Sequence, residues 1–206
     1  MPDRQQSEST RLDSTQQLLF DALKAQGVEG HSVLEIGCGA GRLHQHLLEE
    51  GASSAVGIEL IAEQVEKAKA SAHNLGLDDR AMYFKGDFMK LAAEIEPADI
   101  TILDKVVHCY HDPRLLIRES AAHTKSVYAV AFPAKRPLLA MSMRLLSPIL
   151  RLFLPFRVRF FPPDTIRAWI RENGFERTFQ QDTEMWHTEI YARCEESDKQ
   201  QLPRGE

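Results

Sequence analysis

Apolar residues follow two alternating patterns along the chain. Short, almost continuous apolar runs predict buried strands, because both faces of a parallel sheet are covered. Between these runs, apolar residues recur at spacings of three and four, which predicts amphipathic helices. The predicted strands span residues 32–37, 54–60, 81–87, 98–104, 126–132, 176–181 and 185–194. The predicted helices span residues 14–27, 42–50, 62–76, 114–122 and 163–174.

The order of these elements predicts the architecture. Repeated strand–helix units favour a parallel sheet with right-handed crossovers. The last two strands follow each other without a helix, which predicts a closing antiparallel hairpin. The expected fold class is therefore α/β: a doubly wound, mostly parallel seven-stranded sheet with helices on both faces, of the Rossmann-like kind.

One domain is expected over residues 13–194, because a chain of 206 residues is long enough to bury a single core. Residues 1–12 and 195–206 are polar and are expected to be disordered. Residues 133–163 interrupt the alternation between the fifth strand and the last helix.

The composition narrows the function only slightly. A net charge of −5 gives no indication of nucleic-acid binding. The three cysteines show no CxxC spacing, which argues against a disulfide framework or a structural zinc site and is typical of a reducing cytoplasm. The start of the chain is polar, so we expect no signal peptide, and no run reaches the roughly 18 apolar residues of a membrane span.

The sequence VLEIGCGAGRL, residues 33–43, follows the first predicted strand. Residues 37–41 form a GxGxG turn, whereas a dinucleotide fingerprint requires a third glycine where Arg42 stands. Because glycine has no side chain, a ligand can approach the backbone of this turn closely. A carboxylate at Glu35 repels a pyrophosphate but attracts an ammonium or sulfonium group by about 1–4 kcal/mol. The loop therefore favours a cationic, phosphate-free nucleoside over NAD.

Acidic residues also end the second and third strands. Glu59 lies 18 residues after Gly41, where an acid accepts hydrogen bonds from both ribose hydroxyls, although this position fits NAD as well. In GDF, Asp87 can accept from an adenine amine and the backbone N–H of Phe88 can meet a ring nitrogen. The alternative is that each acid is a solvated side chain at the end of its strand. Acids at three successive strand ends nevertheless favour one continuous ligand-binding site.

The segments VLEIGCGAG, GIEL, GDF and ITILDKVVHCY resemble, in order and spacing, the motifs of class I S-adenosylmethionine-dependent methyltransferases over residues 14–193. DKVVHCYHDPRLL and FPAKRPLLAMSMRLL are similar, more narrowly, to the branch around magnesium protoporphyrin O-methyltransferase, which does not identify porphyrin as the substrate. The resemblance implies S-adenosylmethionine as cofactor. It implies that the cofactor-binding residues are Glu35, Gly37, Cys38, Gly39, Gly41, Glu59, Leu60, Asp87, Phe88, Leu103 and Asp104.

These residues have different implied roles. The first five border the methionine moiety, and Glu59 holds the ribose. Leu60 packs on adenine, whose edge Asp87 and Phe88 define. The backbone at Leu103 and Asp104 faces the ammonium group.

The sequence HCYH after the fourth strand supplies candidate catalytic residues. Methyl transfer needs positioning more than acid or base, yet an alcohol acceptor benefits from a base. His108 is the preferred base, with His111 second and Tyr110 nearby; a purely structural histidine is the alternative. His108, Cys109 and His111 lack a fourth ligand, so no metal is predicted.

Three other histidines are not expected to take part in catalysis. His44 and His46, two apart on the first-loop helix, are expected at the surface. His187 is expected to pack rather than to catalyse.

The insert over residues 133–163 contains six basic residues and no acidic one. Within residues 138–161, Arg144 and Arg151 lie seven apart on one face of an apolar segment that Pro148 interrupts. We interpret the insert as a lid over a bulky, apolar substrate whose anionic group the two arginines bind. A membrane-surface element over residues 138–161 and a buried helical pair are the alternatives.

The sequence therefore predicts a cytoplasmic enzyme that transfers a methyl group from S-adenosylmethionine to a small, apolar molecule, with O-methylation favoured. The alternative is a regulatory protein of the same fold that binds the nucleoside and transfers nothing. A nicotinamide dehydrogenase does not fit the glycine spacing, and a DNA base methyltransferase is disfavoured because the fourth strand lacks an Asn/Asp-Pro-Pro-aromatic turn. No nucleic-acid partner is expected.

Overall fold

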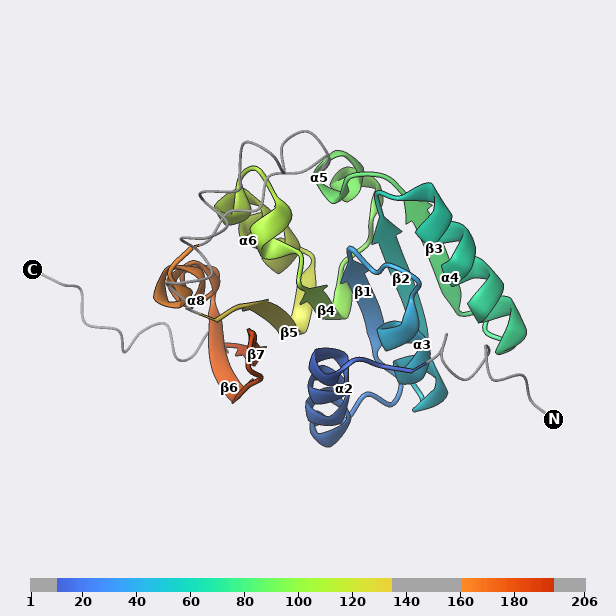
Figure 1. Ribbon diagram of the computed structural model, residues 1–206, viewed down its shortest axis with the longest axis horizontal. Coiled ribbons are helices and arrows are strands. Elements are labelled where there is room, and N and C mark those ends of the chain that lie inside the picture. The colour runs from blue at the N-terminus through green and yellow to red at the C-terminus, as the bar shows by residue number, and fades with distance from the viewer. Residues whose placement is uncertain (1–10, 135–160, 195–206) are drawn as a thin grey trace, which may run out of the picture.

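The computed structural model describes residues 11–134 and 161–194, and its strands form one sheet (Figure 1). The sheet has seven strands in the order β3-β2-β1-β4-β5-β7-β6. Strands β1 to β5 pair in parallel, and β7 pairs antiparallel with both β5 and β6. The strands are β1 (Ser32–Ile36), β2 (Ser54–Glu59), β3 (Ala81–Lys85), β4 (Ala98–Asp104), β5 (Thr124–Pro133), β6 (Phe175–Asp182) and β7 (Trp186–Arg193). The predicted fold class is confirmed, including the closing hairpin.

Helices cover both faces of this sheet. Helix α2 packs on β5 and β7 and contacts α3, whereas α6 packs on β5 and on α8. Figure 1 shows α2 on one side of the sheet and α6 and α8 on the other. The helices are α2 (Ser14–Gln26), α3 (Arg42–Glu49), α4 (Ala62–Asn74), α5 (Phe88–Leu91), α6 (Pro113–Ala122) and α8 (Pro163–Glu172), with 3-10 turns η1 (Ala92–Glu94) and η2 (Val107–Cys109). The pattern of apolar residues did not predict the short α5.

The core forms two layers because side chains alternate between the faces of each strand. In β5, Ala129 and Ala131 pack with the α2 and α3 side, while Tyr128, Val130 and Phe132 pack with the α6 and α8 side. Both sets are fully buried. Each strand of the sheet interior therefore carries apolar residues on both faces, which explains its nearly continuous apolar runs.

Helix α2 begins with a capping box. Asp13 accepts from the backbone N–H groups of Thr15 and Gln16, and the Gln16 side chain accepts from the Asp13 backbone. Leu12, which the sequence analysis assigned to the polar end, is buried against the α2 side of the core. Leu12 thus contributes to the core of the domain.

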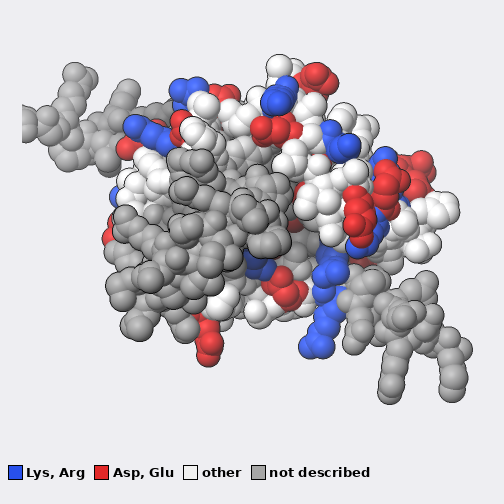
Figure 2. Space-filling view, turned by 45° about the horizontal axis from the view of Figure 1, so that its top comes forward, with Lys and Arg blue, Asp and Glu red and all other residues white. Residues whose placement is uncertain are grey.

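On the part of the face in Figure 2 that grey atoms leave uncovered, charged residues of both signs lie interspersed. On α4, Lys67 pairs with Glu63 at 2.7 Å and Lys69 pairs with Glu66 at 3.1 Å, all four largely exposed. Within residues 11–134 and 161–194, no helix combines the length and apolar character needed to cross a bilayer.

Candidate active site

Strand order reverses at β1, which lies between β2 and β4. A crevice forms at such a point, outside the carboxyl ends of the strands, because successive crossovers leave on opposite faces. The loops that follow β1, β2, β3 and β4 therefore meet at one edge of the sheet. All the residues predicted from the glycine turn and the strand ends lie on or next to these loops.

The glycine loop after β1 is packed tightly against its neighbours. Gly37 has a φ of +72°, and a Cβ there would lie 2.4 Å from Cγ2 of Val106. Gly41 has a φ of +76° and begins α3, where a Cβ would lie 2.8 Å from Nε2 of Gln45. The backbone N–H groups of Gly37 and Cys38 donate to the Ile58 carbonyl at 2.7 and 3.1 Å. Both the backbone conformation and the packing thus require glycine at these two positions.

Glu35 lies behind this loop and not in the cavity wall. Glu35 is 1% exposed, and its Oε2 lies 2.5 Å from Nδ1 of His44. His44 itself is 0% exposed. The His44 backbone N–H lies 3.4 Å from the same oxygen. The prediction that His44 is a surface residue is therefore wrong, and the carboxylate expected beside the ligand is instead held by a buried imidazole.

A hydrogen-bonded chain continues from His44. Tyr83 Oη is 3.0 Å from Nε2 of His44, and Gln45 Nε2 donates to Tyr83 Oη at 2.7 Å. Ser71 Oγ in turn donates to Gln45 Oε1 at 2.7 Å. Burial raises the pKa of Tyr83 to about 12, so its hydroxyl keeps its proton. If Tyr83 donates to Nε2, a neutral imidazole with its proton on Nδ1 satisfies every partner and leaves Glu35 as the acceptor.

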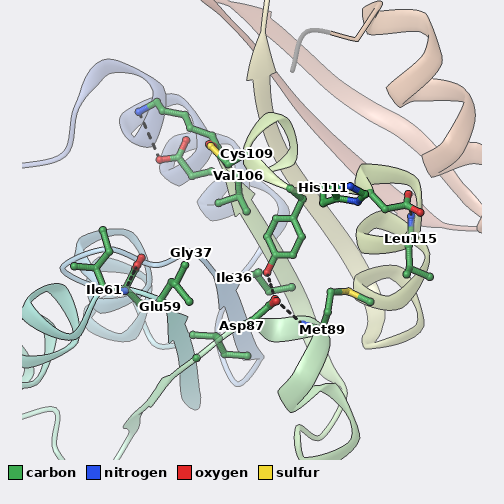
Figure 3. A pocket seen from close by; sticks show the side chains of 17 residues that line it. Ile36, Gly37, Glu59, Ile61, Asp87, Met89, Val106, Cys109, His111 and Leu115 are labelled. Carbon is green, nitrogen blue, oxygen red and sulfur yellow. Dashed lines mark hydrogen bonds and ion pairs between the residues drawn. The ribbon is translucent and has the colours of Figure 1, made fainter. Parts of the chain in front are cut away.

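A cavity of about 580 Å³ opens in front of the glycine loop. Figure 3 shows Glu59 and Ile61 on one side, Met89, His111 and Leu115 on the other, and Asp87 between them. Of the predicted cofactor-binding residues, those that line the cavity are Gly37, Glu59, Leu60, Asp87 and Asp104. Of the predicted catalytic residues, Tyr110 and His111 line it.

Glu59 links the end of β2 to the glycine loop. Its Oε2 accepts from the Gly39 backbone N–H at 3.0 Å, and its Oε1 accepts from the Ile61 backbone N–H at 2.8 Å. A carboxylate has about four acceptor positions, so both oxygens retain capacity for a ligand. Leu60 and Ile61 beside it are 67% and 52% exposed, an apolar surface at the edge of the cavity.

Asp87 caps α5 and also binds Tyr110. Its Oδ1 accepts from the Met89 backbone N–H at 3.1 Å and from the Tyr110 hydroxyl at 3.0 Å. Burial and then the adjacent Asp87 carboxylate raise the pKa of Tyr110. The hydroxyl of Tyr110 is thus protonated and donates to Asp87, and its predicted catalytic role stays a prediction.

His108, the preferred base, does not line the cavity. Its ring centroid lies 5.4 Å from that of Trp186, and its Nδ1 is buried without a hydrogen-bond partner among the described residues. Burial lowers the pKa of His108 to about 4. The role of His108 as the base stays a prediction, and His111 lies on the cavity wall at an exposed position.

The remaining predicted residues have side chains buried in the core, lie away from the cavity or fall outside the described residues. Leu103 and Phe88 are 0% exposed and Cys38 is 4% exposed, so their side chains belong to the core. His187 pairs with Asp182 at 2.8 Å. Arg144 and Arg151, with residues 135–160 of the predicted insert, lie outside the described residues. Within the described ranges, no cluster of His, Cys, Asp and Glu is arranged to hold a metal ion.

Sequence reasoning assigned Asp104 only through its backbone and missed its side chain. The carboxyl group lines the cavity at the end of β4 and is 8% exposed. Its Oδ1 is inaccessible to solvent, and the Gln16 side chain hydrogen-bonds the carboxyl group. Burial raises the pKa of Asp104 to about 7, while the Lys105 ammonium acts in the opposite direction. The position of an acid directly after the apolar run ITIL was the available signal.

Comparison with known proteins agrees with this geometry. A sequence model of the methyltransferase domain family matches residues 33–126. Sterol 24-C-methyltransferase of Debaryomyces hansenii is 34% identical over 90 residues, which cover 43% of this chain and 24% of that protein. 24-methylenesterol C-methyltransferase 2 of Oryza sativa is 32% identical over 91 residues, 44% of this chain and 24% of that protein. The chain thus matches about a quarter of the length of these curated relatives.

Solved structures share the fold. Magnesium protoporphyrin IX methyltransferase from Synechocystis, with bound S-adenosylhomocysteine, superposes with a TM-score of 0.69 at 20% identity, over 88% of this chain and 82% of that chain. Geranyl diphosphate methyltransferase in complex with S-adenosylmethionine gives 0.70 at 15% identity, over 88% and 85%. Residues 33–126 therefore match the methyltransferase domain family, and the chain shares the fold of these two methyltransferase structures.

Proposed function

We propose that this protein binds S-adenosylmethionine in the cavity beyond β1 to β4 and transfers its methyl group to the oxygen of a small, apolar acceptor. The observation that carries the proposal is the meeting of the glycine loop, Glu59 and Asp87 at the ends of three adjacent strands around one cavity. The volume of about 580 Å³ lies in the range of small-molecule sites.

The residues of the cavity fit a cationic nucleoside. Glu59 has acceptor capacity for ribose hydroxyls, and Leu60 offers an apolar surface for a base. The Oδ2 atom of Asp87 is left to accept from an adenine amine, because Oδ1 is engaged by Met89 and Tyr110. Bound S-adenosylmethionine supplies a methyl group on an already activated sulfonium, so positioning and desolvation supply much of the rate.

An apolar acceptor fits the far side of the cavity, which Val106, Met89 and Leu115 line. The similar proteins named for sterol, magnesium protoporphyrin IX and geranyl diphosphate substrates support a bulky apolar molecule. An anionic group on the acceptor, bound by Arg144 and Arg151, stays a prediction, as does membrane contact through residues 138–161. Free thiols at Cys38, Cys109 and Cys194 support a cytoplasmic location within this proposal.

Calorimetry and a transfer assay test the proposal in two steps. We expect S-adenosylhomocysteine to bind with a Kd near 1 µM, about −8 kcal/mol, and NAD to give no heat. A metabolite extract incubated with methyl-labelled S-adenosylmethionine is then expected to yield a product with the corresponding mass shift. Binding of NAD without binding of S-adenosylhomocysteine contradicts the proposal, and nucleoside binding without any transfer favours the regulatory alternative.

Replacing Tyr110 with phenylalanine is expected to weaken S-adenosylhomocysteine binding by about 0.5–1.5 kcal/mol. The change removes one of the two donors that orient Asp87 and leaves the ring in place. Calorimetry of the wild type and of Tyr110→Phe measures the difference in affinity. Unchanged affinity together with a large loss of turnover contradicts the adenine-side role and restores the predicted catalytic one.

A further inference from the structure

A separate hollow lies where α8 packs on β6, at the edge of the sheet opposite β3 in strand order (Figure 1). Its volume is about 210 Å³, and its wall consists of Arg167, Arg171, Glu176, Arg177 and Tyr191. None of these residues lines the cavity beyond β1 to β4, whose charged wall residues are mostly acids. Three of the five carry a guanidinium group, so we refer to it as the arginine hollow.

A buried glutamate holds two of the arginines in place. Glu189 on β7 is 0% exposed. Its Oε1 accepts from Nε and Nη2 of Arg167 at 2.8 and 2.6 Å and from Nη1 of Arg177 at 3.4 Å. Its Oε2 accepts from the Tyr191 hydroxyl. The buried charge is thus compensated, and the glutamate fixes the direction of two guanidinium groups.

Much of the donor capacity of the arginines is unused. A guanidinium group has five N–H donors, and Arg177 uses one of them for Glu189. Arg171 is exposed and forms no hydrogen bond or ion pair with any residue that the structure describes. Glu176 lies in the same wall, yet no ion pair joins it to another described residue. The hollow therefore offers unused N–H groups from a helix and from a strand.

The arrangement of the arginines indicates which anion they suit. Arg167 and Arg171 are four residues apart on α8, so they share one face of the helix, while Arg177 belongs to β6. One guanidinium fork satisfies both oxygens of a carboxylate, whereas the three terminal oxygens of a phosphate monoester can bind two guanidiniums at once. Three arginines against Glu176 and Glu189 leave the hollow with a net positive charge.

We propose that the arginine hollow is a binding site for a small, soluble molecule that carries a phosphate monoester. Arg171 and Arg177 bind the phosphate oxygens with their unused N–H groups. Arg167 stays paired with Glu189 and adds positive potential. The site is separate from the cavity beyond β1 to β4, and it does not depend on the function proposed above.

Calorimetric titration with glycerol 3-phosphate at pH 8 and constant ionic strength tests the site. The phosphate is a dianion at this pH, because its second pKa is near 6. We expect the wild-type protein to bind it with a Kd of about 0.1 mM and to give no heat with acetate. Arg171→Gln is expected to weaken binding about tenfold. Wild-type affinity in this variant overturns the proposal.

Glu176→Gln changes the affinity in the opposite direction. The substitution removes a negative charge from the wall, so binding of glycerol 3-phosphate is expected to tighten about threefold. Weaker binding in this variant contradicts the placement of the phosphate in the hollow.

Arg118→Gln is the matched control for charge. Arg118 lies on α6, has a side chain that is 64% exposed and pairs with Glu119 outside the hollow. Its removal changes the net charge of the protein by the same amount as Arg171→Gln. The Kd for glycerol 3-phosphate is expected to stay within about twofold of that of the wild type. An equal loss in both variants means that general electrostatics attracts the phosphate, and it overturns the proposal.

Thermal unfolding checks that Arg171→Gln acts on the ligand and not on the fold. The Arg171 side chain has no partner among the described residues, so the Tm without ligand is expected to equal that of the wild type. Glycerol 3-phosphate raises the Tm of the wild type by mass action and raises that of the variant less. An equal rise in both proteins contradicts the proposal.

Two further measurements locate the site and identify the source of the phosphate. Glycerol 3-phosphate is expected to bind equally well in the presence of saturating S-adenosylhomocysteine. Displacement of the nucleoside places the phosphate in the cavity beyond β1 to β4 and overturns the proposal. If S-adenosylhomocysteine itself does not bind, the proposed function fails, and the phosphate titrations still decide this site. Sedimentation with phosphatidylcholine vesicles that contain phosphatidate, without any binding of glycerol 3-phosphate, indicates a lipid surface and overturns the soluble ligand.

Discussion

Replacing His44 with leucine is expected to destabilise the protein by about 3 kcal/mol. The reason is that Glu35, which is 1% exposed, would lose the imidazole that lies 2.5 Å from its Oε2. Leucine fills a similar volume but donates no hydrogen bond, so a carboxylate is left buried without a side-chain partner. Tyr83 would also lose the acceptor for its hydroxyl. Chemical denaturation at pH 7 measures the difference in the free energy of unfolding.

A second substitution separates the charge from the packing. In Glu35→Leu/His44→Leu both polar partners are replaced by apolar side chains, and we expect much of the lost stability to return. Tyr83→Phe, which removes only the outer hydroxyl, is expected to cost about 1 kcal/mol. If His44→Leu costs less than Tyr83→Phe, the buried pair does not stabilise the loop as argued.

Replacing Glu59 with alanine is expected to weaken binding of S-adenosylhomocysteine by about 1–3 kcal/mol, which is about 5- to 150-fold in Kd. The carboxylate is the acceptor assigned to the ribose, and it also accepts from the backbone N–H groups of Gly39 and Ile61. Alanine therefore removes a ligand contact and loosens the junction between β2 and the glycine loop. Calorimetry with purified protein measures the change.

Glu63→Ala is the control for charge. Glu63 carries the same charge on α4, pairs with Lys67 and is exposed away from the cavity. Its affinity for S-adenosylhomocysteine is expected to equal that of the wild type. Equal affinity in Glu59→Ala as well would remove the ribose assignment.

Much of the site was predictable because its signals are local. The glycine turn, Glu59 and Asp87 each follow a predicted strand, and the carboxyl ends of parallel strands meet at one edge. The burial of His44 is also indicated by a local pattern in the sequence. His44 lies three and four residues before Leu47 and Leu48 on α3, so it shares their buried face.

The contacts of His108 and Tyr110 were not predictable in this way. His108 and Tyr110 lie in an irregular segment, where residue spacing does not fix the direction of a side chain. The structure turns Tyr110 toward Asp87, 23 residues earlier, and buries His108 against Trp186, 78 residues later. It also buries most of the Asp104 carboxyl group at the end of β4, beside Lys105.

The sequence by itself determined the alternation of strands and helices, the bare glycine turn and the acids at the strand ends. Hydrophobic periodicity and the backbone freedom of glycine are properties of a few neighbouring residues, so a local pattern suffices to specify them. Only the tertiary structure decided that Glu35 is paired behind the loop, that Tyr110 binds Asp87 and that Asp104 faces the cavity. Those outcomes depend on packing between segments far apart in the chain, which sets the burial, the partners and hence the protonation of each group.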